Sequence, residues 1–214
     1  NFPAQKAGLM AGDKILEING VSAKGKTTEE VSKALKGQPN TSVTVLIDRP
    51  YLETPFEVSF DREKISIPSV TYSEYIQEGI AYIRLRSFTR GCANDLKNAI
   101  IELKKEQELK GLILDLRSNP GGLLNESVDI VNLFVEKGEE VVSTKGRIKS
   151  RSKSYFANRK PLDIKVPLVA LINSSSASAS EIVSGAIQDL DRGVVIGQRS
   201  YGKGLVQQTR KLSY

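Results

Sequence analysis

From Phe56 onward, short apolar runs alternate with segments of helical periodicity, and this alternation limits the fold more than any other feature of the sequence. The runs 111–116 and 166–172 are almost continuously apolar, which is typical of parallel strands covered on both faces. Strands that alternate with helices build an α/β core, so we expect a mixed α/β fold for residues 56–214. The predicted strands are 80–85, 111–116, 166–172 and 194–196, and the predicted helices are 94–105, 124–135 and 178–189.

Residues 1–55 have a different organisation. An alternating strand ends in the turn Asn19-Gly20, a helix capped by Thr28 ends near Gly37, and a second alternating strand spans 42–49. The pairs Gly-Leu and Gly-Asp, then Ile-x-x-Ile-Asn-Gly before a helix, resemble a PDZ domain. The resemblance implies that an extended C-terminal peptide binds as an added strand. The carboxylate-binding loop would precede Pro3, so we expect the N-terminal part of this domain to be missing. A role as a lid or spacer is the alternative.

The composition excludes several kinds of site. The chain has no histidine, which rules out a Ser-His-Asp triad and histidine-based metal sites within these 214 residues. A single cysteine, Cys92, allows no internal disulfide and no CxxC motif. The sequence therefore predicts no metal and no cofactor, and any general base is a Lys, Asp, Glu or Tyr.

The net charge of +6 is concentrated in one segment. Seven Lys and Arg residues and no acidic residue lie between Thr144 and Lys160, which leaves the rest of the chain close to neutral. Five of them alternate at period two, which predicts one face of an exposed hairpin. The hairpin is either solvated or a basic patch for an acidic partner. Tyr155 and Phe156 are too few aromatic residues for a base-stacking surface, so nucleic acid is not expected as a partner.

Three segments rich in small residues each follow a predicted strand. They are Asn-Pro-Gly-Gly over 119–122, Asn-Ser-Ser-Ser-Ala-Ser-Ala-Ser-Glu over 173–181, and the segment 197–204, in which Lys203 lies between two glycines. Small residues let the backbone turn tightly and present hydroxyl and N–H groups at a helix N-terminus, where an oxyanion would be stabilised. A Ser-rich helix start that serves only as a cap is the alternative for the second segment.

Four features follow one another in chain order: the PDZ-like unit, Leu-Asp-Leu-Arg-Ser-Asn-Pro-Gly-Gly, Ser-Ala-Ser-Ala-Ser-Glu-Ile and Gly-Lys-Gly-Leu-Val-Gln. On these features the sequence resembles the carboxyl-terminal processing peptidases, also called tail-specific proteases. The resemblance covers essentially the whole chain. It implies a crotonase/ClpP-like α/β protease core over 56–214, preceded by a small PDZ domain over 1–55. Members of this family continue beyond the lysine motif, so we expect the C-terminal part of the core to be missing.

The resemblance also implies the roles of individual residues. Ser178 would be the nucleophile, Lys203 the general base, and Gln207 the residue that orients the lysine. The amides expected to stabilise the oxyanion are those of Ala179 and of either Gly121 or Gly122, between which the sequence does not choose. A lysine can replace histidine when burial lowers its pKa from ~10.4 to roughly 7–8, so that the amine is neutral near the working pH.

The function implied is that of a serine endopeptidase that cleaves proteins near an apolar C-terminus, with the PDZ domain recognising the tail. Protein or peptide substrates are the expected partners, and an adaptor or activator protein and a homo-oligomer fit the same resemblance. A periplasmic or exported location in a bacterial envelope is implied, with membrane association only through segments outside these residues. Two alternatives are a catalytically inactive PDZ-containing scaffold protein and a crotonase-like acyl enzyme, the latter disfavoured by the PDZ unit.

Overall fold

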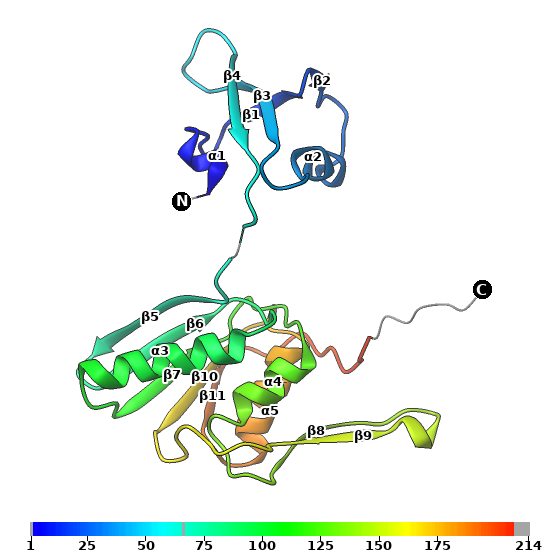
Figure 1. Cartoon of the computed structure of the whole chain (residues 1–214). Coiled ribbons are helices and arrows are strands. Elements are labelled where there is room, and N and C mark those ends of the chain that lie inside the picture. Colours follow the sequence, from blue (N-terminus) through cyan, green and yellow to red (C-terminus); the bar gives the residue numbers. More distant parts are fainter. Residues whose placement is uncertain (1, 66, 208–214) are drawn as a thin grey trace. The chain divides into compact units, whose positions relative to one another are not determined.

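The computed structural model describes residues 2–65 and 67–207 and contains two compact units, Asn1–Ile67 and Pro68–Tyr214 (Figure 1). None of the helices in the described residues is long and apolar enough to cross a membrane.

The first unit is a four-stranded antiparallel sheet with two helices. The strand order is β2-β1-β3-β4. Ile18, Val43, Val45 and Ile47 form its buried core, and the alternation along β3 matches the predicted pattern. The elements are α1 (Pro3–Lys6), β1 (Lys14–Ile18), β2 (Val21–Ser22), α2 (Thr28–Leu35), β3 (Ser42–Asp48) and β4 (Phe56–Asp61).

Strand β4 extends this unit beyond Pro55, where the sequence analysis ended it. β4 pairs with β3 from Ser42↔Asp61 to Ile47↔Phe56, and Phe56 and Phe60 pack against the first core. Alternation of apolar residues identifies a strand but not the sheet to which it belongs, which is why the sequence placed Phe56 in the second unit.

The cap of α2 also differs from the prediction by one residue. Thr27, rather than Thr28, is the N-cap, and it forms a capping box with Glu30. The Glu30 N–H donates to Thr27 Oγ1 at 3.3 Å, and the Thr27 N–H donates to Glu30 Oε2 at 2.7 Å. At the other end of α2, the Arg62 guanidinium donates to the carbonyl oxygens of Leu35 and Ala34. These oxygens lie in the last turn and receive no hydrogen bond from an N–H group of the helix.

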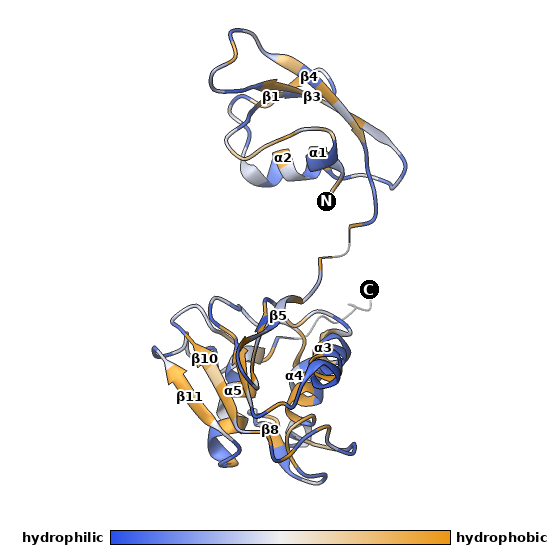
Figure 2. Cartoon of the chain, turned by 90° about the vertical axis from the view of Figure 1, so that its left-hand side faces the viewer, coloured by the Kyte–Doolittle hydropathy of each residue, from blue (hydrophilic) through white to orange (hydrophobic). Residues whose placement is uncertain are grey.

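The second unit confirms the predicted mixed α/β fold. Its sheet has the order β11-β10-β7-β6-β5, in which β5 and β6 are antiparallel and the other pairs are parallel. Figure 2 shows β10 and β11 in orange, whereas much of α3 is blue. The elements are β5 (Val70–Gln77), β6 (Ile80–Leu85), α3 (Cys92–Glu106), β7 (Gly111–Asp115), α4 (Leu124–Val131), β8 (Glu140–Thr144), β9 (Lys153–Phe156), β10 (Leu168–Ile172), α5 (Ala179–Asp189) and β11 (Val194–Gly197).

One core joins the sheet to α3, α4 and α5. Leu96, Ile100 and Leu103 of α3 are buried, as their spacing predicted, together with Leu112 and Leu114 of β7. The nearly continuous apolar character of β7 and β10 therefore corresponds to the central strands of the sheet, where burial is greatest.

Helix α4 is shorter than predicted. It ends at Val131, because Leu133 and Phe134 donate to carbonyl oxygens three residues earlier and tighten the chain into a turn. The buried Asn132 side chain accepts from the N–H groups of Asn158 and Arg159 and donates to the Arg159 carbonyl oxygen. These bonds attach the end of α4 to residues 158–159.

The hairpin β8–β9 is present, but its basic residues do not lie as predicted. Lys145 and Arg147 lie in the connection between the strands, and a short 3₁₀ turn spans Lys149–Arg151. Only Lys153 of the alternating set belongs to a strand. The basic residues therefore surround the tip of the hairpin instead of sharing one face of a strand.

Candidate active site

Three loops meet at the carboxyl edge of the parallel strands. They follow β7, β10 and β11, which are neighbours in the sheet, so their ends lie at one edge. The Ala177 N–H donates to the Asn119 carbonyl oxygen at 3.1 Å, and the Tyr201 N–H donates to the Ser176 carbonyl oxygen at 3.0 Å. These bonds tie the loop after β10 to both of its neighbours.

A cavity of about 380 Å³ lies at this junction. Ser178, Lys203, Gln207 and Gly122 all line it, so the chain brings together four of the six residues singled out from the sequence. Its remaining walls are largely apolar and come from α4, β8, α5 and the last described segment. They are Leu123, Leu124, Val142, Ser143, Thr144, Ile182, Gly204, Leu205 and Val206.

Ser178 adopts a backbone conformation that L-residues rarely take. It is the N-cap of α5, with φ 56° and ψ −113°. Strained conformations of this kind persist where the surroundings impose them, and a sharp strand-to-helix turn is a recurrent way to expose a nucleophile. Ala179 is the first residue of α5, so its buried N–H has no acceptor within the helix.

Gly121 packs directly against this turn. A Cβ atom on Gly121 would lie 2.5 Å from the Ala177 carbonyl oxygen and 2.8 Å from the Ala179 nitrogen, and its φ is +95°. The Gly121 N–H already donates to Asn119 Oδ1 at 2.9 Å. Gly121 thus allows the close approach of two loops, and its N–H is engaged.

Gly122 differs from Gly121 in the use of its N–H. It forms a parallel bridge with Phe88, through Phe88 N–H to Gly121 O and Leu123 N–H to Phe88 O. The Gly122 N–H takes no part in this pairing and has no hydrogen-bond acceptor among residues 2–65 and 67–207. Gly122 also lines the cavity that holds Ser178.

Glu181 is the residue that sequence reasoning missed. Its Oε2 accepts from the N–H of Ser178 at 2.7 Å and of Lys203 at 2.9 Å. Its Oε1 accepts from the Ser200 hydroxyl at 2.8 Å and from the Gly202 N–H at 2.6 Å. One carboxylate therefore joins the serine turn to the lysine loop.

The charge on Glu181 is stabilised by these contacts. Partial burial alone would raise the pKa of Glu181, but hydrogen bonds from the Ser200 hydroxyl and three backbone amides outweigh it and hold the pKa below the ordinary glutamate value. The spacing Ser-x-x-Glu from Ser178 to Glu181 is that of a capping box, and this signal could have identified Glu181 from the sequence.

Lys203 is exposed, which differs from the buried amine that the sequence analysis expected for a lysine base. Residues 201–207 form no helix or strand and leave its side chain open to solvent. Lys203 Nζ donates to Gln207 Oε1 at 3.3 Å. Ser178 and Lys203 line one cavity, and their side chains form no hydrogen bond with each other in the described chain.

The family model of peptidase family S41 matches residues 79–214, and a PDZ domain model matches residues 1–49. The chain belongs to peptidase family S41. This confirms the resemblance derived from the sequence motifs, and the PDZ match confirms the nature of the first unit.

Individual S41 relatives resemble the chain along nearly its whole length. The carboxy-terminal-processing protease of Bartonella bacilliformis is 40% identical over 208 residues, which are 96% of this chain and 47% of that protein. The probable CtpA-like serine protease of Staphylococcus aureus is 39% identical over 213 residues, 98% of this chain and 41% of that protein. The chain thus spans less than half the length of these relatives.

A solved structure of the photosystem II D1 C-terminal processing protease has a similar fold. It superposes with a TM-score of 0.60 at 32% identity and covers 99% of this chain and 57% of that one. A putative S41 protease from Bacteroides fragilis superposes with a TM-score of 0.57 at 20% identity, which supports the fold alone.

Proposed function

We propose that the chain acts as a serine endopeptidase that cleaves proteins near an apolar C-terminus, with Ser178 as nucleophile and Lys203 as general base. The observation that carries the proposal is the convergence of Ser178, Lys203 and Gly122 on one cavity, with no acceptor for the Gly122 N–H in the described part of the chain. Membership of family S41 supports the same activity.

In the proposed reaction, the neutral amine of Lys203 accepts the hydroxyl proton as Ser178 Oγ attacks the scissile carbonyl carbon. The tetrahedral oxyanion then accepts hydrogen bonds from the N–H groups of Ala179 and Gly122. Lys203 returns its proton to the leaving amine, and water hydrolyses the acyl-enzyme by the same steps. Substrate that fills the cavity would exclude water from Lys203, supplying the desolvation that the exposed side chain lacks.

Gly122 is proposed over Gly121 as the glycine donor, because the Gly121 N–H is already engaged by Asn119. We expect Gly122→Ala to lower kcat about 10²-fold, since its Cβ would lie 2.3 Å from the Phe88 carbonyl oxygen and shift the donor. The check is steady-state kinetics beside circular dichroism. Native kinetics in a folded Gly122→Ala variant would exclude Gly122 as a donor.

Gln207 is proposed to orient the base through its contact with Lys203 Nζ. We expect Gln207→Ala to lower kcat about tenfold, as loss of one hydrogen bond to the amine would. Gln207→Glu keeps an acceptor oxygen at this position but places a negative charge beside an amine that has to react as a neutral base, so it should also lower kcat. Equal kcat in wild type and both variants would remove Gln207 from the site.

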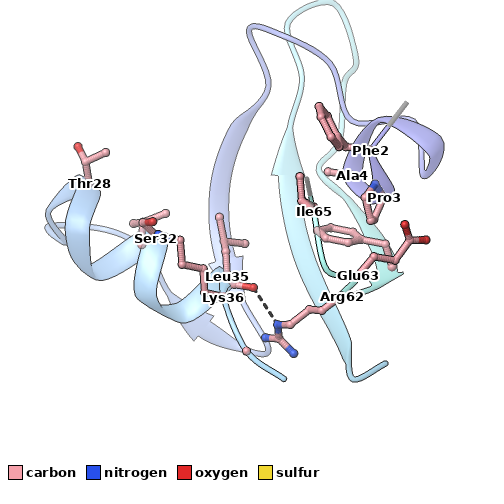
Figure 3. A pocket seen from close by; sticks show the side chains of 13 residues that line it. Phe2, Pro3, Ala4, Thr28, Ser32, Leu35, Lys36, Arg62, Glu63 and Ile65 are labelled. Carbon is pink, nitrogen blue, oxygen red and sulfur yellow. Dashed lines mark hydrogen bonds between the residues drawn. The ribbon is translucent and has the colours of Figure 1, made fainter. Parts of the chain in front are cut away.

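Two features favour a substrate with an apolar tail: the apolar walls of the cavity and a groove in the first unit. The groove has a volume of about 480 Å³ and is lined by Val31 and Leu35 of α2 and by Phe60 and Ile65. Figure 3 shows Leu35 and Ile65 among its lining side chains. PDZ domains hold peptide tails next to the equivalent helix, so we propose that this groove takes the apolar end of the substrate. The Bartonella bacilliformis relative is named for carboxy-terminal processing, which fits cleavage near the C-terminus of a substrate, and we also propose a periplasmic or exported location.

The proposed function is tested with an unfolded reporter protein that ends in apolar residues, compared with the same reporter ending in charged residues. Wild type is expected to cleave the first faster, and Ser178→Ala is expected to cleave neither. If wild type bound the apolar tail without any cleavage, the chain would be a PDZ-containing scaffold protein instead.

A further inference from the structure

We propose that the tip of the hairpin β8–β9 is a basic arm that binds an acidic stretch of the substrate beside the scissile bond. The basic arm is defined here as Lys145, Arg147, Lys149 and Lys153. The inference rests on the proposed peptidase function and names a feature of the substrate.

The basic arm begins at the wall of the cavity. Val142, Ser143 and Thr144 of β8 line the cavity that holds Ser178, and Lys145 follows directly. Lys153 of β9 is the pairing partner of Thr144. The hairpin then extends away from α4 and α5 (Figure 1). A polypeptide that leaves the cavity along β8 therefore passes the basic arm.

Strand β8 is also suited to guide such a polypeptide. It pairs with β9 along one edge, and within the described chain its other edge pairs with no strand. An exposed strand edge can add an extended peptide through main-chain hydrogen bonds that do not depend on sequence. Side-chain preference then has to come from residues beside the strand, which here are the cations of the arm.

The charges of the arm are not neutralised by carboxylates in the described part of the chain. All four side chains belong to exposed residues, and none forms an ion pair with an acidic residue in the described part of the chain. Lys153 Nζ lies 4.6 Å from the centre of the Tyr155 ring, which leaves its charge accessible. By contrast, Arg159 at the base of the hairpin pairs with Asp129 at 3.5 Å.

Unpaired like charges in one loop repel each other, and an acidic ligand relieves this repulsion. Several weak surface pairs acting together give a preference that falls with ionic strength. The arm therefore selects substrates in which an acidic stretch lies beside an apolar cleavage site. The apolar cavity and the basic arm bind different parts of one substrate polypeptide.

The test uses two peptides with the same cleavage site and the same apolar C-terminus. One carries a run of glutamates beside the site, and the other carries glutamines. Wild type is expected to favour the glutamate peptide about tenfold in kcat/KM at low salt, and the preference should shrink as salt is added. The double variant Arg147→Glu/Lys149→Glu should lose the preference and cleave the glutamine peptide as wild type does.

A matched control is Lys137→Glu/Lys165→Glu, which has the same change in net charge. Like the arm residues, these exposed lysines form no ion pair in the described part of the chain, and they do not line the cavity that holds Ser178, so the control should keep the wild-type preference. Equal cleavage of the two peptides by wild type would overturn the proposal. So would an equal loss of both activities in the arm variant, because that result indicates a structural role.

Binding to Ser178→Ala separates this proposal from the proposed function. If wild type cleaves neither peptide, the peptidase assignment fails, and the binding preference of Ser178→Ala for the glutamate peptide still decides the role of the arm. Arm-dependent binding to anionic lipid vesicles, with no preference between the peptides, would assign the arm to a membrane surface and overturn the proposal.

Discussion

Ser178→Ala and Lys203→Ala are each expected to lower kcat/KM by at least about 10³-fold, because each removes one half of a single proton-transfer unit. For the same reason, the double variant should be little worse than either single variant. The measurement is kcat/KM on a peptide with an apolar C-terminus, with thermal unfolding as the check on folding.

The matched control for the lysine is Lys165→Ala, which removes an exposed cation that precedes β10, at the edge of the sheet opposite to the cavity loops. It should retain wild-type activity. If the losses of the two single variants multiplied in the double variant, each residue would act without the other. That result would argue against a Ser178/Lys203 dyad.

Glu181→Gln is expected to lower kcat about 10²-fold, the loss typical of a reacting group moved by about 1 Å. Glutamine offers one acceptor oxygen where the carboxylate accepts four hydrogen bonds, so its NH₂ group would face two of the donors. Ser178 and the 200–203 loop would then lose their common anchor. Glu136→Gln, at an exposed position outside the cavity, is the control.

The effect of Glu181→Gln should appear in kcat more than in KM, because Glu181 positions the reacting groups without forming part of the apolar walls. Lowering the pH of the wild-type protein should cause a similar loss of kcat. The lowered pKa of Glu181 means that its contribution is complete at neutral pH and is lost as the pH falls through that pKa. A Glu181→Gln variant with wild-type kcat, or one that is more acid-sensitive than wild type, would contradict this role.

The meeting of the three loops could be predicted because each follows a parallel strand. The apolar runs 111–116 and 166–172 correspond to β7 and β10, and the turns at Asn119 and Ser178 follow these strands at one edge of the sheet. The spacing of Leu96, Ile100 and Leu103 predicted the buried face of α3. These features depend on local periodicity and on a general rule of sheet topology, which a single sequence carries.

What escaped prediction depends on contacts between distant residues. Three of the four bonds of Glu181 reach residues 19 to 22 positions away, and the Asn132 side chain bonds residues 26 and 27 positions away. The difference between Gly121 and Gly122 rests on one side-chain acceptor, Asn119 Oδ1. The exposure of Lys203 is likewise a property of packing, which its glycine neighbours do not determine.

The central claim is that Ser178 is a nucleophile made reactive by Lys203, and covalent labelling tests it most directly. The protein is treated with a serine-directed fluorophosphonate, and the modified peptide is identified by mass spectrometry. We predict an adduct on Ser178 in wild type and its loss in a folded Lys203→Ala variant. An adduct on a different serine, or equal labelling of Ser178 without Lys203, would contradict the claim.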